Sequence, residues 1–403
     1  MKIVFTHPFS GKEKGGIAAC MPLLLESYQR HGMDGEIISQ LWPHESPPEE
    51  AVHAGEFNRA NSSGSFEHHC FPTKDRSGFG YSPGLFQFVA SRLNNAQIAH
   101  SHGLWMYLNW ATFRAARAQK KPFIVSPHGM LEPWALARST AKKRFLRALF
   151  QDQVLRRAAC LHALCEAEAQ SIRALGFQTP VAIVPNGVNL SDFVSLPPRE
   201  EFHQQWPQTK GRHIILFLAR LHPKKGALPL LESWKNLASD FPDWHLVLAG
   251  PDENGYRREL ESAVEQFGLT SQVTFTGMLE GTAKMAALAA AEVFVLPSFS
   301  EGFSVALLEA MASKIPLLLT PQCNFPEAVH AGAAFETSPN SVDIEEKLKA
   351  LLQLSADERQ KMGNCGYELV CERYTWDEIA KEMGRVYHWC LHGGEKPSSI
   401  ILA

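Results

Sequence analysis

The sequence lacks the patterns of several common site types. No Cys-x-x-Cys pair occurs among its eight cysteines, so neither a zinc site nor a disulfide framework is indicated, and free thiols in a reducing cytoplasm are expected. The Gly-x-Gly-x-x-Gly fingerprint of dinucleotide-binding enzymes is missing. No Asp-x-Asp pair offers two carboxylates to a divalent metal. We therefore expect neither a cofactor nor a metal ion.

The chain also lacks a strong net charge and long apolar runs. Its formal net charge is −3 over 403 residues, which argues against nucleic acid as a partner. No window reaches the roughly eighteen apolar residues that a membrane span needs. The apolar stretch at residues 2–6 is too short for a signal peptide. These absences predict a cytoplasmic protein, and peripheral attachment to the inner face of the cytoplasmic membrane stays open.

What the chain does contain is an alternation of strand and helix patterns, which is typical of α/β proteins. Its length suggests two domains. The polar, proline-containing segment 191–212 is the predicted linker between a domain at 1–190 and a domain at 213–375. Residues 376–403 begin with an amphipathic helix pattern and are predicted to pack back on the first domain. Residues 41–83, rich in Pro, Gly, Ser and His, are predicted to be irregular.

The segment 297–312 predicts a ligand site. It joins the apolar strand pattern 293–296 to a strongly helix-forming stretch, with Ser304 as the expected N-cap. The helix start would present free backbone N–H groups, those of Phe303, Ser304 and Val305. Such groups and the helix dipole favour an anion such as a diphosphate. Glu301 and Glu309 flank this point, and since phosphate repels a carboxylate, we expect them to bind sugar hydroxyls.

Two cations are predicted at the same edge of the sheet. Arg220 and Lys225 follow the strand pattern 213–219, and the carboxyl ends of parallel strands share one edge. Cations there would neutralise a diphosphate and stabilise it as a leaving group without a metal. The alternative is a surface loop with solvated charges.

The first half carries two further candidates. Gly15 and Gly16 lie in a loop after the first strand pattern, where the lack of a side chain permits close approach to a ligand. An ordinary turn is the alternative. His128 follows the strand pattern 123–126 directly, and the strand pattern 98–101 also leads into His-Gly. We expect both His-Gly loops at one edge of a sheet, with His128 in the site.

The region 103–160 is basic, with eleven Lys or Arg residues against Glu132 and Asp152 alone. Its helix pattern at 139–159 has an apolar stripe among the cations. The predicted members of this stripe are Phe145, Leu146, Leu149, Val154 and Leu155. Two interpretations stay open: a solvated surface helix, or a face that rests on an anionic membrane surface.

Taken together, these residues resemble a known family. Glu301 and Glu309 match an E-x7-E motif, and Arg220 and Lys225, followed by glycine, match R-x4-K-G. The Pro-Asn-Gly-Val at 185–188 and the Ser-Pro-His-Gly-Met at 126–130 match two further signatures. The chain resembles the retaining nucleotide-sugar glycosyltransferases of GT-B fold, family 4, of the bacterial surface-polysaccharide type. That fold implies two Rossmann-like α/β domains that face each other across a cleft.

The resemblance implies a role for each motif residue. Arg220 and Lys225 would bind the donor diphosphate, Glu309 the ribose hydroxyls and Glu301 the donor sugar, while His128 would contact the sugar from the first domain. Glu301, His128, Arg220 and Lys225 are the expected catalytic residues. The remaining expected donor-binding residues are Gly302, Phe303, Ser304, Val305, Gly277, Met278, Leu279, Gly15 and Gly16.

By the same resemblance, the enzyme would move a hexose from a UDP- or GDP-linked donor to a glycan or a lipid-linked acceptor. Ser304 and the dipeptide 323–324 depart from the usual family pattern and bear on donor choice. Two alternatives stay open. One is a nucleotide-sugar-binding scaffold without transferase activity, and the other is an epimerase or phosphorylase on a similar fold.

Overall fold

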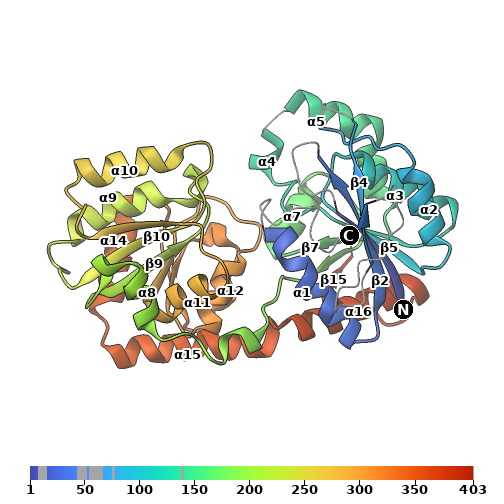
Figure 1. The fold of residues 1–403 in the computed structure, drawn as a ribbon. Coiled ribbons are helices and arrows are strands. Elements are labelled where there is room, and N and C mark those ends of the chain that lie inside the picture. Colours follow the sequence, from blue (N-terminus) through green and yellow to red (C-terminus); the bar gives the residue numbers. More distant parts are fainter. Residues whose placement is uncertain (8–15, 43–51, 54–66, 75–77, 138–139, 403) are drawn as a thin grey trace. The chain divides into compact units, whose positions relative to one another are not determined.

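A computed structural model of the chain describes residues 1–7, 16–42, 52–53, 67–74, 78–137 and 140–402. The chain forms two compact units (Figure 1). Unit 1 comprises Met1–Asn186 together with Trp376–Ala403, and unit 2 comprises Gly187–Thr375.

Unit 1 is built on a parallel sheet that has nine strands within the described residues, in the order β15-β8-β7-β6-β5-β1-β2-β4-β3. Among these strands, only the edge strand β15, which comes last in the chain, is antiparallel to its neighbour β8. The strands are β1 (Lys2–His7), β2 (Asp34–Leu41), β3 (Val52–His53), β4 (Glu67–Pro72), β5 (Ile98–His102), β6 (Phe123–Ser126), β7 (Cys160–Ala163), β8 (Val181–Ile183) and β15 (Ile400–Ile401). β4 pairs with β2 over six residues, so the prediction of an irregular 41–83 segment was wrong there. The sequence of β4 hid this strand, because only two of its six residues, Cys70 and Phe71, are buried apolar side chains.

Helices cover this sheet. They are α1 (Gly16–Arg30), α2 (Leu85–Leu93), α3 (Tyr107–Ala118), α4 (Pro133–Ala137), α5 (Thr140–Leu146), the π-helical η2 (Arg147–Gln151), α6 (Asp152–Arg157), α7 (Glu166–Ala174) and α16 (Trp376–His392). α16 packs against α1, and Tyr387 of α16 is fully buried.

The predicted apolar stripe of 139–159 divides into two faces. Leu146, Val154 and Leu155 are buried, whereas Phe145 is 65% and Leu149 is 64% exposed. Neighbouring positions point about 100° apart on a helix, so Phe145 and Leu149, four residues apart, share an outer face. The prediction of a single apolar stripe was wrong because it merged these two faces.

Unit 2 contains a six-stranded, fully parallel sheet in the order β11-β10-β9-β12-β13-β14. Its strands are β9 (His213–Leu218), β10 (Trp244–Ala249), β11 (Val273–Gly277), β12 (Ala291–Leu296), β13 (Leu317–Leu319) and β14 (Ala334–Glu336). Its helices are α8 (Arg199–Gln205), α9 (Ala227–Leu237), α10 (Tyr256–Gln266), α11 (Gly281–Ala290), α12 (Val305–Ala312), α13 (Pro326–His330), α14 (Ser341–Gln353) and α15 (Ala356–Arg373).

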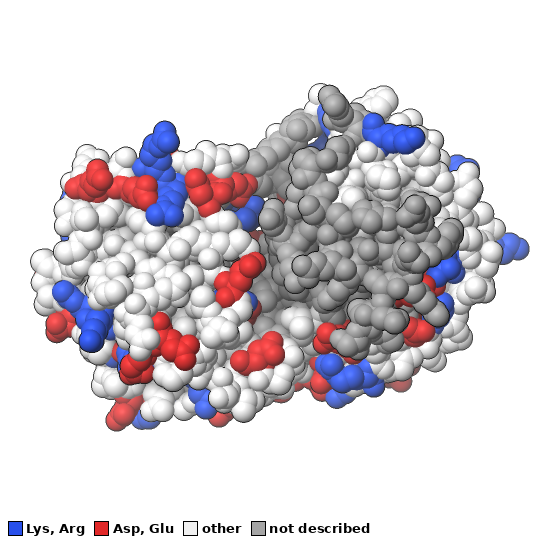
Figure 2. All heavy atoms as spheres, viewed as in Figure 1, with Lys and Arg blue, Asp and Glu red and all other residues white. Residues whose placement is uncertain are grey.

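The segment 191–212, predicted as a linker, contains α8 within unit 2. Phe202 of α8 is fully buried in the core of that unit. The charged residues of this helix lie on its other face. Two parallel-sheet units confirm the predicted α/β fold class. In the view of Figure 2, basic and acidic side chains are interspersed over the visible surface of unit 2.

Candidate functional site

The carboxyl edge of the unit 2 sheet brings together the loops that follow β9 and β12. These strands are parallel neighbours, so the loop with Lys225 and the loop with Glu301 start side by side. Lys225 ends the short 3-10 turn η5 (Pro223–Lys225). Phe299 N–H donates to Lys224 O over 2.8 Å, which ties the two loops together.

Lys225 and Glu301 form an ion pair at this edge. Lys225 Nζ lies 2.6 Å from both carboxylate oxygens of Glu301. The side chains are only 14% and 8% exposed. Ser298, which is fully buried, donates its hydroxyl to Glu301 Oε1 over 2.6 Å. The structure thus brings together the two residues that the motifs separate by 76 positions.

The loop after β13 holds the backbone of Glu301. Asn324, at a φ of 57°, donates its side-chain N–H to Glu301 O over 2.6 Å. Glu301 N–H donates to Gln322 O over 2.9 Å. The unusual Cys323-Asn324 dipeptide therefore acts on the site through the backbone of Glu301, and Cys323 itself is buried.

Glu309 also has a cationic partner, which was not among the residues predicted from the sequence. Lys284 Nζ of α11 lies 2.6 Å from Glu309 Oε1. The two side chains are 25% and 15% exposed. Lys284 could have been predicted from its place in the chain, because α11 starts just after β11, at the same carboxyl edge of the sheet.

The start of α12 is open to a ligand. Ser304 occupies the N-cap position, as predicted, and its side chain makes no hydrogen bond to the first turn. A Cβ on Gly302 would meet nothing within 4 Å. Phe303 instead packs inward, with its ring 5.1 Å from that of Phe325 and stacked on Tyr374 at 5.9 Å. Only backbone groups remain available at residue 303.

Three other expected donor-binding residues differ in exposure. Arg220 is 55% exposed and its guanidinium lies 2.6 Å from Glu253. Met278 is 49% exposed, whereas Leu279 is buried in the core of unit 2. Of the loop after Gly277, then, Met278 rather than Leu279 offers a side chain to a ligand.

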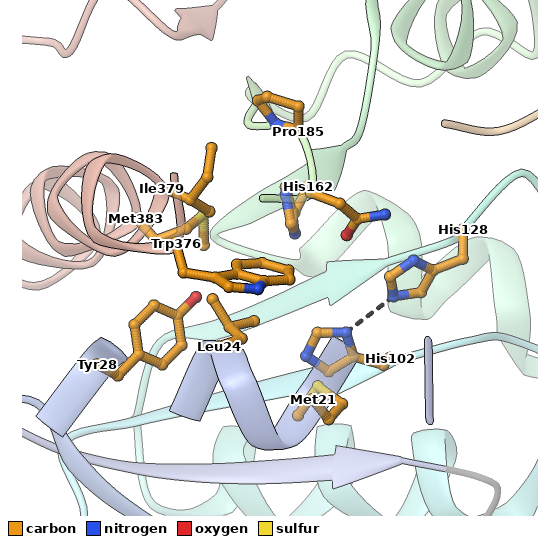
Figure 3. A pocket seen from close by; sticks show the side chains of 11 residues that line it. Met21, Leu24, Tyr28, His102, His128, His162, Pro185, Trp376, Ile379 and Met383 are labelled. Carbon is orange, nitrogen blue, oxygen red and sulfur yellow. Dashed lines mark hydrogen bonds between the residues drawn. The ribbon is translucent and has the colours of Figure 1, made fainter. Parts of the chain in front are cut away.

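In unit 1, the histidine loops meet as predicted. His102 ends β5, and its Nδ1 lies 2.8 Å from Nε2 of His128 (Figure 3). The two rings stack with centroids 5.1 Å apart. His128 has a φ of 53°, an uncommon backbone conformation that the surroundings must hold. Gly16 is the first residue of α1, and Gly15 lies outside the described residues.

Glu168 helps to hold the backbone conformation of His128. Its carboxylate accepts Gly129 N–H over 2.6 Å and Leu164 N–H over 2.8 Å, so it fixes the backbone beside His128. Burial, the largest influence, raises the pKa of Glu168 to about 7 even though the two N–H groups favour the carboxylate. Glu168 could not be predicted from the sequence, because its role depends on a tertiary contact across 39 residues.

A small cavity of about 20 Å³ lies beside this pair in unit 1. Histidine, aromatic and apolar side chains line it, among them His102, His128, His162, Trp376 and Met383 (Figure 3). Burial lowers the pKa values of His102 and His128 well below 6.5, with neighbouring histidines adding to the shift. Both rings are therefore neutral at pH 7.

We expect unit 1 to lose stability as the pH falls below 6.5. Burial lowers the pKa of His162 to about 4 and that of His100 well below its usual value. The unfolded histidines bind protons that the folded ones do not, so stability declines from pH 6.5 towards 4. The lowered pKa of His162 alone corresponds to a loss of roughly 3 kcal/mol in the free energy of unfolding at pH values below 4.

Glu168 acts in the opposite direction, because its raised pKa contributes stability that is present below pH 4.5 and lost as the pH rises through 7. The four buried histidines outweigh it. Urea denaturation at pH 7, 5.5 and 4.5 measures the net change in the free energy of unfolding. The variant His162→Gln should make this free energy depend less on pH. An unfolding free energy that stays constant from pH 6.5 to 4.5 would contradict neutral histidines.

One group with metal-ligand spacing occurs among the described residues, formed by Glu36, Glu67 and His69. Arg92 already binds both carboxylates, with Nη2 2.8 Å from Glu67 and Nε bonded to Glu36. A guanidinium therefore supplies the positive charge there. Within the described part of the chain, no helix is both long and apolar enough to cross a membrane.

The sequence matches two family models that together span most of the chain. Residues 15–187 match the Glycosyl transferase 4-like domain, and residues 198–369 match Glycosyl transferases group 1. The phosphatidyl-myo-inositol mannosyltransferase of Mycobacterium leprae is 24% identical over 98% of this chain and 99% of its own length. The GDP-mannose:cellobiosyl-diphosphopolyprenol alpha-mannosyltransferase of Xanthomonas campestris is 24% identical over 75% of this chain and 77% of its own.

Solved structures show the same fold. HepE from Anabaena, crystallised with UDP and glucose, superposes with a TM-score of 0.74 at 16% identity, over 96% of this chain and 99% of that one. A glycosyltransferase from Rickettsia africae gives a TM-score of 0.73 at 14% identity, over 98% and 99% of the two chains. The chain therefore belongs to the GT-B glycosyltransferases of family 4, as its motifs predicted, and is an enzyme of the glycosyltransferase class.

Proposed function

We propose that the enzyme transfers a hexose from a nucleoside-diphosphate sugar, with retention at the anomeric carbon, and that unit 2 binds the donor. The observation that carries this proposal is the Lys225–Glu301 pair, nearly buried at the carboxyl edge of a parallel sheet. Ligands of open α/β sheets bind at that edge. An ammonium group has three N–H donors, and since Glu301 takes two, one remains for a phosphate oxygen.

The proposed roles of the two glutamates follow from their partners. Each carboxylate has about four acceptor sites, and the Lys225 and Ser298 contacts to Glu301 leave capacity for sugar hydroxyls. Glu309, held by Lys284, is proposed to bind the ribose. Arg220, the open start of α12 and the backbone of Gly302 are proposed to bind the diphosphate.

The proposed mechanism is a front-face displacement. The anomeric C–O bond to the diphosphate breaks, the acceptor oxygen bonds on the same face, and the acceptor proton passes to the leaving phosphate. Glu301 is the only motif carboxylate assigned to the sugar, and its ion pair with Lys225 keeps it from acting as a free nucleophile. The fixed cations stabilise the departing charge, and His128 of unit 1 is assigned to the sugar.

Thermal shift with nucleoside diphosphates tests the donor assignment. A ligand that binds the folded state raises the midpoint by mass action, about 2.7 kcal/mol of stability at a hundredfold excess over Kd. Either UDP or GDP should raise it more than ADP does. A midpoint that none of the three changes would contradict donor binding. The relatives named for GDP-mannose and the neighbour crystallised with UDP leave both bases as candidates.

We further propose that the acceptor is lipid-linked and that unit 1 contacts an anionic membrane surface. The relatives named above for phosphatidyl-myo-inositol and diphosphopolyprenol support such an acceptor. Exposed Phe145 and Leu149 lie on an outer face beside exposed Lys142 and Arg144. An apolar face with flanking cations suits the interface of an anionic bilayer.

Vesicle binding tests this surface. The double variant Lys142→Glu/Arg144→Glu and the double variant Phe145→Ser/Leu149→Ser should each weaken binding to phosphatidylglycerol vesicles at least fivefold, at roughly 1 kcal/mol per basic residue. Lys143 is kept because its ammonium group donates to Ala135 O. Val342→Ser, in unit 2 and 74% exposed, is the matched control. Binding that neither salt nor these changes weaken would exclude the surface.

A further inference from the structure

The His102–His128 pair has an outer nitrogen on each ring. These atoms, His102 Nε2 and His128 Nδ1, are buried and lack a hydrogen-bond partner among the described residues. His102 itself is 2% exposed. A neutral imidazole carries one donor nitrogen and one acceptor nitrogen. Because the two inner nitrogens share one proton, one outer nitrogen must be a donor and the other an acceptor, and only two arrangements exist.

Two neighbouring histidines, His100 and His162, show how hydrogen-bond partners determine a histidine tautomer. Val184 O accepts from His162 Nε2 over 2.7 Å, so the neutral ring of His162 accepts Ser126 O–H at Nδ1, also over 2.7 Å. Ser126 Oγ then accepts from His100 Nε2 over 2.7 Å. His100 Nδ1, in turn, accepts the hydroxyl of Tyr387 over 2.6 Å. A single carbonyl thus determines the tautomers of two histidines.

Trp376 provides the corresponding constraint for His102. Its indole Nε1, which can only donate, is also buried without a partner among the described residues. Both side chains line the small cavity, and Figure 3 shows the indole nitrogen on the side of the cavity where His102 lies. The cavity, at about 20 Å³, has room for about one water molecule.

A water in that cavity favours one arrangement. It would accept from Trp376 Nε1–H and donate to His102 Nε2, and both buried groups would be satisfied. With a proton on His102 Nε2, the water would accept hydrogen bonds from both rings, and neither of its own O–H groups would have an acceptor on these two side chains. Leaving a buried polar group unsatisfied costs about 1–3 kcal/mol.

We propose that His102 is a positioning residue that sets the tautomer of His128: His102 Nδ1–H donates to His128 Nε2, and His128 keeps its own proton on Nδ1. Stacking of His102 on His100, with centroids 4.3 Å apart and planes at 27°, holds the donating ring in place. His128 Nδ1 then carries a proton, so this atom can donate a hydrogen bond but cannot accept a proton. The consequence for catalysis rests on the proposed function; the tautomer does not.

Nitrogen-15 spectra of histidine-labelled protein test the tautomer without a substrate. In the wild type, His128 should be protonated at Nδ1 and His162, the internal reference, at Nε2. His102→Leu should give His128 a mixture of tautomers, and His102→Asn, whose amide can still donate from near the Nδ1 position, should restore the wild-type pattern. A proton on His128 Nε2 in the wild type, or an unchanged His128 after His102→Leu, would overturn the proposal.

Trp376→Phe tests the cavity separately. Removing the indole donor should broaden or shift the His102 Nε2 signal and mix the tautomers of the pair. An unchanged spectrum in Trp376→Phe would overturn the part assigned to Trp376. The wild-type assignment does not depend on the folding of any variant.

Release of UDP from UDP-glucose and of GDP from GDP-mannose provides the activity readout. His128→Ala and His102→Leu should each lower kcat about tenfold or more, with KM changed less, and the double variant should lose no more than His128→Ala alone. Normal release by His128→Ala would contradict the role of His128 in the proposed function. Reduced release by His128→Ala with normal release by His102→Leu would overturn the positioning role alone.

Discussion

Lys225→Ala should reduce kcat/KM by about 10²–10³, the size expected when one preorganised charge contact to the leaving group is lost. Nucleoside diphosphate binding should weaken as well. The nearly buried Glu301 carboxylate would lose its counter-ion, so stability should also fall, by roughly 3–5 kcal/mol. Steady-state kinetics and urea denaturation of the same sample separate the two effects.

A neutral replacement of the whole pair provides the control. Lys225→Met/Glu301→Gln leaves no buried charge unpaired and should recover most of the stability while the turnover stays low. Arg220→Ala should also lower turnover and nucleotide binding, but with little change in stability, because its pair with Glu253 is exposed. Near-normal turnover in Lys225→Ala would remove this cation from the proposed site.

Gly226→Ala should disrupt the same site through the backbone. Gly226 has a φ of 76°, and a Cβ there would lie 2.0 Å from the carbonyl oxygen of Pro297. Pro297 precedes Ser298, which holds Glu301. The added methyl group must therefore push the Glu301 loop away from Lys225. We expect a loss of roughly 3 kcal/mol or more in the free energy of unfolding, and most of the turnover.

Gly211→Ala is the matched control for this substitution. Gly211 also lies in unit 2 and has a φ of 74°, yet a Cβ there would meet nothing within 4 Å. It should cost only the left-handed backbone strain of about 1–2 kcal/mol and leave turnover unchanged. Equal losses in the two variants, by urea denaturation and kinetics, would show that the clash with Pro297 has no part in the effect.

Much of unit 2 could be predicted from the sequence because its signals are local. The apolar run 293–296 forms buried β12, and Ser304 lies at the N-cap of α12. In the sequence, Lys225 and Glu301 each follow a predicted strand. Because the carboxyl ends of parallel strands lie at one edge of a sheet, both residues were predicted at that edge. Hydrophobic patterning and the chirality of β-α-β connections therefore suffice for the fold class and for this pair.

Only the tertiary structure decided which groups each side chain meets. Nothing local links Glu309 to Lys284 or Gly129 to Glu168, since these contacts depend on how separate elements pack. The strand β4 and the two faces of the 139–159 helix escaped prediction for the same reason: burial, not residue type, distinguishes them. The sequence by itself determined two parallel α/β units and the edge that carries the motif residues. Packing determined their charge partners, exposure and protonation, because those properties depend on distances across elements far apart in the chain.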